Sequence, residues 1–365
     1  MKDLVRIALL LAGGLAGLLA CQLNHADTDE PVTPTPPTGG SFQATPYPWQ
    51  PPAHFPDMVY DLSKNPLTYE GVQLGKTLFY DGLLSRNGTI SCGFCHSPFT
   101  AFAHTDHALS HGIDDRIGTR NVPGIQNVAW SKNFFWDGGV VHLDLLPIAP
   151  IQHPDEMGDS LANVLRKVGN SGRYRPLFKA AYGTEEVTSE RLLKALSQFM
   201  LTMVSANSKY DKYLRKESGG TLTDAEQRGL SLFTQHCAGC HAGPLQTDQR
   251  FRNNGLPPAP ADRPADLGRY AITLRPEDRF AFRVPSLRNV QMTPPYMHDG
   301  RFQTLEQVLQ HYAGGVVDSP TLDPQLKANG KTGIPLSAGE QRDLIQFLYT
   351  LTDYDFITNR QLQPN

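Results

Sequence analysis

The pattern Cys-x-x-Cys-His occurs twice in this chain, in SCGFCHSP at 91–98 and in HCAGCHAGP at 236–244. Two thiols separated by two residues can each add to a vinyl group of one haem, and the next histidine then lies beneath the iron. Zinc is the main alternative, because paired cysteines and histidines also suit a tetrahedral site. Each motif supplies its residues within five positions and no second cysteine pair lies nearby. The sequence therefore predicts two covalently bound haems c.

These two motifs account for nearly all of the cysteines. The first haem would be held by Cys92, Cys95 and His96, and the second by Cys237, Cys240 and His241. Of the 5 cysteines only Cys21 is left over, so no disulfide framework is expected. A net charge of −3 without a basic cluster argues against a nucleic-acid partner.

The N-terminus indicates export. Residues 1–20 have a basic start and an apolar run from position 7 that is too short for a comfortable membrane span, as in a signal peptide. The end of the run, LLAC at 18–21, resembles the lipobox of bacterial lipoproteins, whose cysteine becomes the acylated first residue. The alternative is an ordinary signal peptide that happens to contain a cysteine. Since bacteria attach haem c outside the cytoplasm, we expect a periplasmic lipoprotein anchored to a membrane through Cys21.

The rest of the chain divides into a tether, two domains and a tail. Residues 21–56 are rich in proline and threonine without an apolar period, which predicts a flexible tether. The pattern G-x-x-L-F precedes both haem motifs, in LGKTLF at 74–79 and RGLSLF at 228–233, and indicates a duplicated cytochrome c unit. The expected domains are 57–215 and 216–355, with a tail at 356–365.

Apolar periodicity predicts a mainly α fold, with two cytochrome c-like domains that each carry one covalently attached haem. A long amphipathic helix is expected over 189–215, where Met200 and Met203 have helical spacing and suit a core better than a haem ligand. Further helices are expected over 224–235, 304–313 and 337–351, and capping boxes start the first and the last of these.

What fills the sixth position of each iron decides between an electron carrier and a catalyst. After His241, the side chains that could bind the second iron are those of Met292, Met297, His298, His311 and Tyr312. Spacing alone does not choose among them.

Several long segments resemble the bacterial di-haem cytochrome c peroxidases over nearly all of 65–353. They are LGKTLFYD, the paired haem motifs, GTRNVP, FFWDGG, APIQHPDEM, RVPSLRNV and TPPYMHDGRFQTLEQVLQHY, in that order. The resemblance implies a peroxidatic haem in 57–215 and an electron-transfer haem in 216–355. It also implies a bridging aromatic residue, a catalytic carboxylate and a calcium site between the haems. The matching residues are Trp136 for the bridge, Glu156 for the carboxylate, and Asn121, Thr293 and Pro295 for calcium.

Each of these assignments has a physical rationale and a plainer alternative. Trp136 has a large oxidisable ring that could relay an electron, or it is an ordinary core residue. Glu156 could move a proton between the two oxygens of hydrogen peroxide, which is typically worth about 10² to 10⁴ in rate, or it is a surface carboxylate. Thr293 and Pro295 can offer only hydroxyl or carbonyl oxygens, and these hard donors suit calcium.

The chain departs from the family pattern at two positions. Tyr312 stands 14 residues after His298, where the cytochrome c peroxidases have a methionine ligand to the second iron. A tyrosine occurs there in the di-haem enzymes that mature tryptophan tryptophylquinone, and a phenolate favours ferric and higher states. Alternatively, Tyr312 packs and Met297 binds the iron. His298 is expected to hydrogen-bond a haem propionate. Leu146 replaces the usual glutamine beside the distal pocket.

His111 resembles the removable distal histidine of the family, with two extra residues before the Arg-Asn pair. Whether His111 binds the first iron or faces solvent stays open from sequence. It lies in a segment, 103–118, that also holds His104 and His107 and that we expect to be mobile.

Three functions follow. The favoured one is reduction of hydrogen peroxide to water above His96, with Glu156 as acid and base and electrons from a small cytochrome c or copper protein. The second is a di-haem enzyme whose high-valent haems, stabilised by Tyr312, oxidise residues of a partner protein. The third is a lipid-anchored electron carrier without enzymatic activity. The sequence also leaves open whether the chain forms a homodimer.

Overall fold

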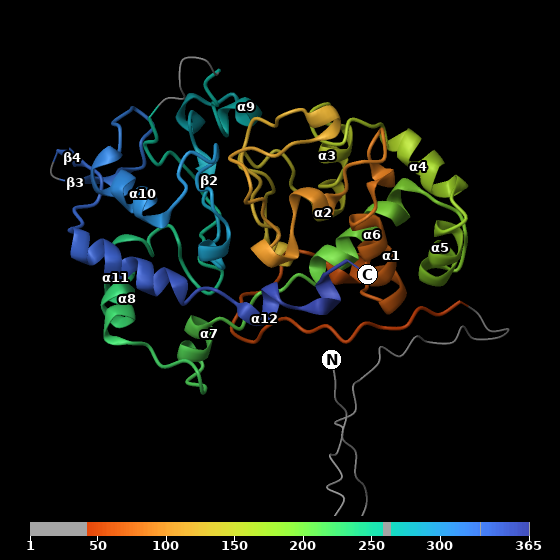
Figure 1. Cartoon of the computed structure of the whole chain (residues 1–365), viewed down its shortest axis with the longest axis horizontal. Helices are drawn as coiled ribbons and strands as arrows, with labels where there is room; N and C mark the ends of the chain where they lie inside the picture. Colours follow the sequence, from red (N-terminus) through yellow and green to blue (C-terminus); the bar gives the residue numbers. More distant parts are fainter. Residues whose placement is uncertain (1–41, 258–263, 329, 365) are drawn as a thin grey trace, which may run out of the picture. The chain divides into compact units, whose positions relative to one another are not determined.

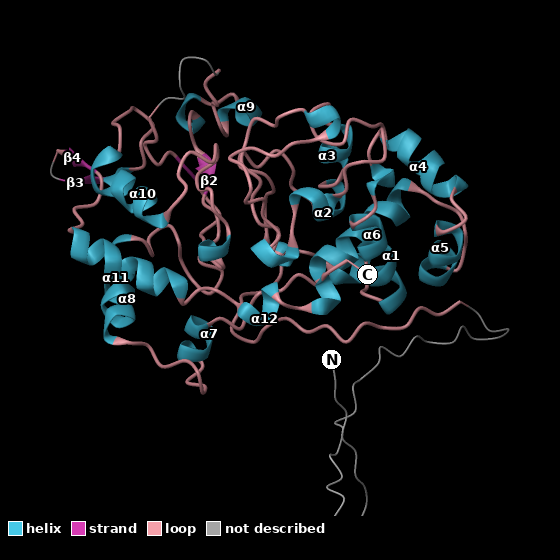
Figure 2. Cartoon of the chain, viewed as in Figure 1, coloured by secondary structure: helices cyan, strands magenta, loops and turns pink. Residues whose placement is uncertain are grey.

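A computed structural model describes residues 42–257, 264–328 and 330–364 (Figure 1). Helices and short helical turns dominate its regular structure (Figure 2). Strands in this part of the chain are limited to two short antiparallel pairs. These pairs are β1 (Phe251–Arg252) with β2 (Phe282–Arg283) and β3 (Lys327–Ala328) with β4 (Lys331–Thr332). The predicted mainly α class is confirmed.

The helices have the following bounds: α1 Tyr69–Phe79, α2 Cys92–Cys95, α3 Ile148–Gln152, α4 Leu161–Asn170, α5 Tyr174–Tyr182, α6 Ser189–Leu201, α7 Lys209–Leu214, α8 Asp224–His236, α9 Tyr270–Thr273, α10 Leu305–Gln310, α11 Ala338–Tyr349 and α12 Tyr354–Ile357. Both predicted capping boxes form, with Thr223 at the start of α8 and Ser337 at the start of α11. None of the helices within the described ranges is long and apolar enough to cross a membrane.

The internal repeat appears as two equivalent helix crossings. At the first, a Cβ on Gly75 of α1 would lie 1.9 Å from the Ala195 carbonyl oxygen of α6. At the second, a Cβ on Gly229 of α8 would lie 2.0 Å from the Asp343 carbonyl oxygen of α11. Only glycine lets the helix backbones approach this closely, so the G-x-x-L-F pattern marks the same packing contact in both copies.

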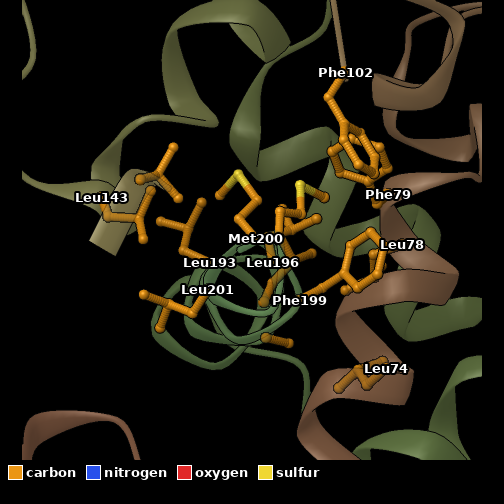
Figure 3. Packing of buried hydrophobic residues seen from close by; sticks show 14 of the residues in the cluster. Leu74, Leu78, Phe79, Phe102, Leu143, Leu193, Leu196, Phe199, Met200 and Leu201 are labelled. Carbon is orange, nitrogen blue, oxygen red and sulfur yellow. The ribbon is translucent and has the colours of Figure 1, made fainter. Parts of the chain in front are cut away.

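Each copy of the repeated unit has its own hydrophobic core, where the first copy is the unit with the first haem motif and the second copy is the unit with the second. The first is built largely on α1 and α6, where Leu74, Leu78 and Phe79 meet Leu196 and Phe199 (Figure 3). Met200 and Met203 are buried in this core, as predicted. The second core joins α8, α10 and α11 through Phe233, Leu305, Leu344 and Phe347, among others.

The single helix predicted over 189–215 is wrong. α6 ends at Leu201, where the Thr202 hydroxyl donates to the Phe199 carbonyl at 2.7 Å, and α7 begins after Ser208. The segment between them is polar, and its groups bond outside the helix. Asp353, for example, accepts hydrogen bonds from the Ser205 hydroxyl and the amides of residues 206 and 207. Serine and asparagine compete with the helical backbone in this way.

Both ends of the described chain pack against the folded part. Phe356 and Leu362, in the segment predicted as a tail, are buried in the first core. The predicted tether is too long at its C-terminal end, because residues 42–56 carry aromatic side chains that find partners. Trp49 lies against Trp130, with ring centroids 6.2 Å apart. The predicted signal peptide, lipobox and Cys21 lie outside the described residues.

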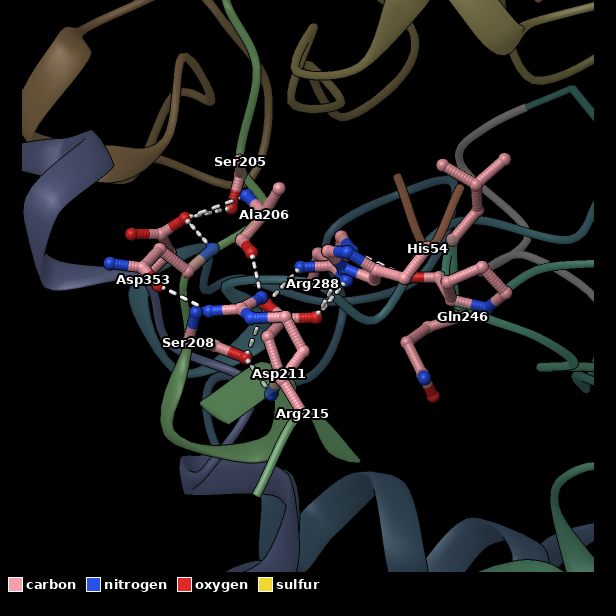
Figure 4. Close-up of polar contacts among 12 residues, drawn as sticks. His54, Ser205, Ala206, Ser208, Asp211, Arg215, Gln246, Arg288 and Asp353 are labelled. Carbon is pink, nitrogen blue, oxygen red and sulfur yellow. Dashed lines mark hydrogen bonds and ion pairs between the residues drawn. The ribbon is translucent and has the colours of Figure 1, made fainter. Parts of the chain in front are cut away.

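A buried ion pair joins Asp211 to Arg288 of the second copy, and His54 of the N-terminal segment 42–56 lies beside it (Figure 4). Asp211 of α7 accepts two hydrogen bonds from Arg288, at 2.9 and 2.6 Å, and its side chain is 1% exposed. His54 Nε2 lies 3.2 Å from the same carboxylate. Burial alone would raise the pKa of Asp211, but the Arg288 hydrogen bonds and charge overcome this and lower it to about 2.

Candidate haem cavity and peroxide site

Both Cys-x-x-Cys-His motifs line one cavity of about 1500 Å³. This is larger than the roughly 300–1,000 Å³ of a typical small-molecule pocket, as a site for two macrocycles requires. The four cysteines of the motifs border the cavity.

His96 has the proton arrangement that a proximal ligand needs. Its Nδ1 lies 2.6 Å from the carbonyl oxygen of Phe102. Because a carbonyl can only accept, Nδ1 carries the proton and Nε2 keeps its lone pair. Burial lowers the pKa of His96 to about 4, so the ring is neutral at pH 7. Ala101 and Phe102 both have left-handed φ angles, 52° and 60°, which turn the carbonyl towards His96.

His241 is held in the same way but less tightly. Its Nδ1 is shared between the carbonyl oxygens of Gln246 and Pro285, at 3.3 and 3.2 Å. Gln246 again has a left-handed φ, 53°. Burial lowers the pKa of His241 to about 4. The residues of both motifs therefore fit covalently attached haem c.

Trp136 borders the cavity with both motifs. Its indole Nε1 donates to the Asn121 carbonyl at 2.8 Å, and its own carbonyl accepts from the Arg283 amide at 2.7 Å. The first bond holds the ring on the first copy, and the second ties the Trp136 backbone to a strand of the second copy.

Glu156 is half-buried on the cavity wall, in the turn after α3. Burial raises the pKa of its carboxyl, the nearby His153 acts to lower it, and Asp155 raises it further. The carboxylate lies 3.9 Å from His153 Nδ1 and close enough to Cys95 to affect the pKa of that thiol. It therefore lies near the first motif. Leu146 borders the same cavity and adds no polar group.

The three residues assigned to calcium also border this cavity. Asn121 and Pro295 are buried, and the Thr293 hydroxyl donates to the Val290 carbonyl at 3.3 Å. No group of three His, Cys, Asp or Glu suited to a metal occurs among the described residues. These residues can offer amide, hydroxyl and carbonyl oxygens, which are among the donors that calcium accepts.

The structure narrows the candidates for the second iron. Met297, His298 and Tyr312 border the cavity, whereas His311 is buried with its Nε2 3.1 Å from the Asn254 carbonyl. His298 stacks flat on Phe282, with centroids 3.8 Å apart. Met292 packs against the first core.

Tyr312 lies in a π-helical turn, His311–Gly315, that follows α10. Such turns are rare and are often found at functional sites. Burial raises the pKa of the Tyr312 phenol, and a hydrogen-bonding contact with Asn254 acts to lower it. Burial has the larger effect, and the pKa is raised to about 12. The Asn254 amide nitrogen also lies 3.4 Å from Met297 Sδ, so both candidate ligands share one polar neighbour.

His111 is not among the residues that border the cavity. Its Nδ1 lies 2.5 Å from Asp115, and its ring packs on His107 with centroids 4.9 Å apart. His104 also stacks on His107, with ring centroids 6.0 Å apart. The side chain of His111 therefore contacts Asp115 and His107 and does not border the cavity.

Three residues at this site were not predicted from the sequence: Phe102, Gln246 and Asn254. Phe102 and Gln246 supply the carbonyls that hold the proximal histidines, and no side-chain pattern reports a carbonyl. Asn254 contacts both candidate ligands of the second iron, and it carries no motif. A left-handed backbone at Phe102 is not visible in sequence, because it is imposed by the tertiary packing of a fully buried aromatic side chain.

The comparisons with known proteins agree with this geometry. A model of the di-haem cytochrome c peroxidase family matches residues 69–219. Methylamine utilization protein MauG of Methylorubrum extorquens is 36% identical over 305 residues, which cover 81% of this chain and 82% of MauG. The chain belongs to the di-haem cytochrome c peroxidase family. Cytochrome c551 peroxidase of Nitrosomonas europaea is 36% identical over 241 residues, which cover 65% of this chain and 71% of that peroxidase.

Solved structures share the fold. A MauG-like protein associated with microbial copper homeostasis is 33% identical, with a TM-score of 0.77 over 87% of this chain and 99% of that protein. The di-haem peroxidase BthA of Burkholderia thailandensis is 25% identical, with a TM-score of 0.70 over 80% of this chain and 88% of BthA. The predicted family and its fold of two haem domains are confirmed. This di-haem peroxidase family includes cytochrome c peroxidases and MauG alike.

Proposed function

We propose that the chain reduces hydrogen peroxide to water at the site formed by His96 and Glu156. The observation that carries the proposal is the half-buried Glu156 carboxylate, with a raised pKa, on the wall of the cavity that His96 borders. Haem bound there through Cys92, Cys95 and His96 would supply the redox-active iron.

The protein groups divide the remaining work. Glu156 takes a proton from one oxygen of peroxide and returns it to the other, so that the O–O bond breaks with water as the leaving group. His96 keeps its Nδ1 proton on Phe102 and so presents a neutral ring. Two electrons and two protons complete the conversion of one peroxide to two waters. On this proposal Trp136, which borders the same cavity as both motifs, passes these electrons inward from a small cytochrome c or copper protein.

Replacement of Glu156 by glutamine tests this proposal, because glutamine keeps the shape and removes the base. We expect peroxide turnover by the haem-loaded protein to fall about 10²- to 10⁴-fold. Glu186→Gln, on the exposed surface, is the control. An E156Q protein with unchanged turnover would remove Glu156 from the reaction.

A second candidate function is oxidation of residues in a partner protein, and Tyr312 favours it. The phenol borders the cavity from a π-helical turn, where a hard anionic donor would suit a second haem in a high oxidation state. MauG is among the similar proteins. On this proposal a protein side chain supplies the electrons that peroxide consumes.

The ferric spectrum distinguishes the ligands of the second iron. Tyr312→Phe keeps the ring and removes the oxygen, so it should abolish any phenolate signature in absorption and EPR. Met297→Leu should leave the same spectrum unchanged. The opposite pattern would assign Met297 as the ligand and favour electron entry from a small redox protein.

We further propose a periplasmic location with a lipid anchor at Cys21, and one calcium ion held by Asn121, Thr293 and Pro295. Metal analysis of the purified holoprotein tests the cation, with one calcium per chain expected. Labelling with a radioactive fatty acid tests the anchor, and Cys21→Ser should abolish the label.

A further inference from the structure

The loop at 110–118 packs directly against the backbone of the Glu156 turn. The Ile113 amide donates to the Glu156 carbonyl at 2.7 Å. The loop also closes on itself, with the Gly112 amide 2.7 Å from the Arg116 carbonyl and the Gly118 amide 3.0 Å from the Ser110 carbonyl. The segment that carries His111 is therefore also the segment that touches the candidate acid and base.

Gly112 leaves no free space at this contact. A Cβ on Gly112 would lie 2.1 Å from the Asp155 carbonyl oxygen and 2.6 Å from both Cα and the carbonyl oxygen of Glu156. These are backbone atoms, so no side-chain rotation can relieve the overlap. The φ of Gly112 is −101°, which any residue can adopt. Glycine is therefore required here because there is no space for a Cβ, and not because of the backbone conformation.

Ile113 anchors the contact to the first core. Its side chain is fully buried there, and it lies against Gly158 at the end of the Glu156 turn. The turn is closed from its other side by the His153 carbonyl, which accepts from the amides of Glu156 and Gly158 at 3.1 and 2.9 Å. Glu156 is thus held from both sides by backbone hydrogen bonds.

We propose that Gly112 and Ile113 are positioning residues that fix the Glu156 carboxylate over the peroxide site. This inference rests on the proposed function and adds to it, because it makes the 110–118 loop a structural part of the site. An added methyl group at Gly112 would overlap the backbone of Asp155 and Glu156, so the loop and the Glu156 turn would have to move apart by an amount on the order of 1 Å. Misplacement of that size can cost about 10²-fold in rate.

A double-mutant cycle in the haem-loaded protein tests the proposal. The variants are Gly112→Ala, Glu156→Gln and the double variant, with Gly172→Ala as control because a Cβ there meets nothing within 4 Å. We expect Gly112→Ala to slow the reaction with peroxide about 10²-fold, and the double variant to be no slower than E156Q alone. Gly172→Ala should match the wild type.

An equilibrium measurement gives a second readout. Fluoride added to the ferric protein should bind best when a protonated Glu156 donates a hydrogen bond to it. We expect G112A and E156Q to weaken fluoride binding to a similar extent, and the double variant no further. Should G112A fold poorly, Ile113→Val removes one methyl group without adding atoms, and we expect it to show the same non-additivity in a smaller effect.

The possible results distinguish the positioning role of Gly112 and Ile113 from the proposed function in peroxide reduction. Effects of G112A and E156Q that simply multiply, in rate and in fluoride affinity, would overturn the positioning role and leave the proposed function standing. A G112A protein with wild-type rate and affinity would do the same. An E156Q protein with wild-type rate would remove Glu156 from the reaction and overturn this inference, whereas a haem-loaded wild type that does not turn peroxide over would overturn the proposed function.

Discussion

His96 donates its Nδ1 proton to the carbonyl oxygen of Phe102 across 2.6 Å. Phe102 in turn packs against Phe356 near the C-terminus, with ring centroids 5.8 Å apart. Helix α12 therefore supports the segment that holds His96, although almost 260 residues separate this helix from the first Cys-x-x-Cys-His motif.

Loss of the Phe356 ring should destabilise the protein strongly. Phe356 is 4% exposed, and truncation of a buried phenylalanine typically lowers the free energy of unfolding by about 3–5 kcal/mol. We expect this loss for Phe356→Ala in chemical denaturation. Tyr354→Ala, on the same helix but 60% exposed, should change the free energy of unfolding by no more than about 0.5 kcal/mol. Equal effects of the two variants would contradict the packing described here.

The two glycine crossings should respond alike to an added methyl group. Gly75→Ala and Gly229→Ala each place a Cβ against a backbone carbonyl, and overpacking typically costs about 1–3 kcal/mol. Both variants should lower the thermal midpoint by similar amounts, whereas Gly172→Ala should not. A large effect at only one of the two glycines would argue against equivalent packing in the two copies.

The Asp211–Arg288 pair makes stability depend on pH in the acid range. The folded-state pKa of Asp211 is lowered to about 2, while an unfolded aspartate titrates near 4. The contribution of this pair to the free energy of unfolding is thus complete above about pH 4. It is lost as pH falls towards 2, a change of roughly 2 kcal/mol. Denaturation of the wild type at a series of pH values should show this loss.

The variant Asp211→Asn separates this pair from the other carboxylates. At neutral pH it leaves Arg288 buried without its charge partner, which should lower the free energy of unfolding by about 3–5 kcal/mol. Asp343→Asn breaks the surface pair with Arg228, which is 60% exposed, and should change the free energy of unfolding far less, because water screens an exposed pair. A D211N protein as stable as D343N would contradict the role of the buried pair.

The raised pKa of Glu156 predicts an acid limb in the rate of peroxide reduction. Glu156 must be deprotonated to accept the first proton, so the rate should fall as pH drops through a pKa above the ordinary value of a glutamate. Burial is the main cause of this shift. The limb should be absent from the pH profile of E156Q. A wild-type rate that stays flat down to the ordinary range of a glutamate would contradict the environment described for this side chain.

The sequence predicts the parts of the fold that side-chain patterns encode. Capping boxes at Thr223 and Ser337 locate two helix starts, because the residues that satisfy the first amides are local. The break after Leu201 was missed, since the partners of the polar segment, such as Asp353, lie far away in sequence. The anchoring of the C-terminal segment was missed for the same reason.

At the candidate site, too, some features follow from side-chain patterns in the sequence and others do not. Motif spacing predicts the haem-binding residues, and the resemblance adds Trp136 and Glu156, which border the same cavity as both motifs. The orientation of His111 depends on Asp115 and His107, and spacing does not report a rotamer. The contact between Gly112 and Glu156 is made by backbone atoms and leaves no side-chain signal.

The central claim is that two covalently bound haems share one cavity and that only the one held by His96 reacts with peroxide. Haem quantification and peroxide mixing on the holoprotein, with its Cys92→Ala/Cys95→Ala and Cys237→Ala/Cys240→Ala variants, test it most directly. We predict two haems per chain in the wild type and one in each variant, with a rapid reaction with peroxide lost only from the first variant. A wild-type protein with fewer than two haems, or a rapid reaction that survives loss of the first attachment site, would contradict the account.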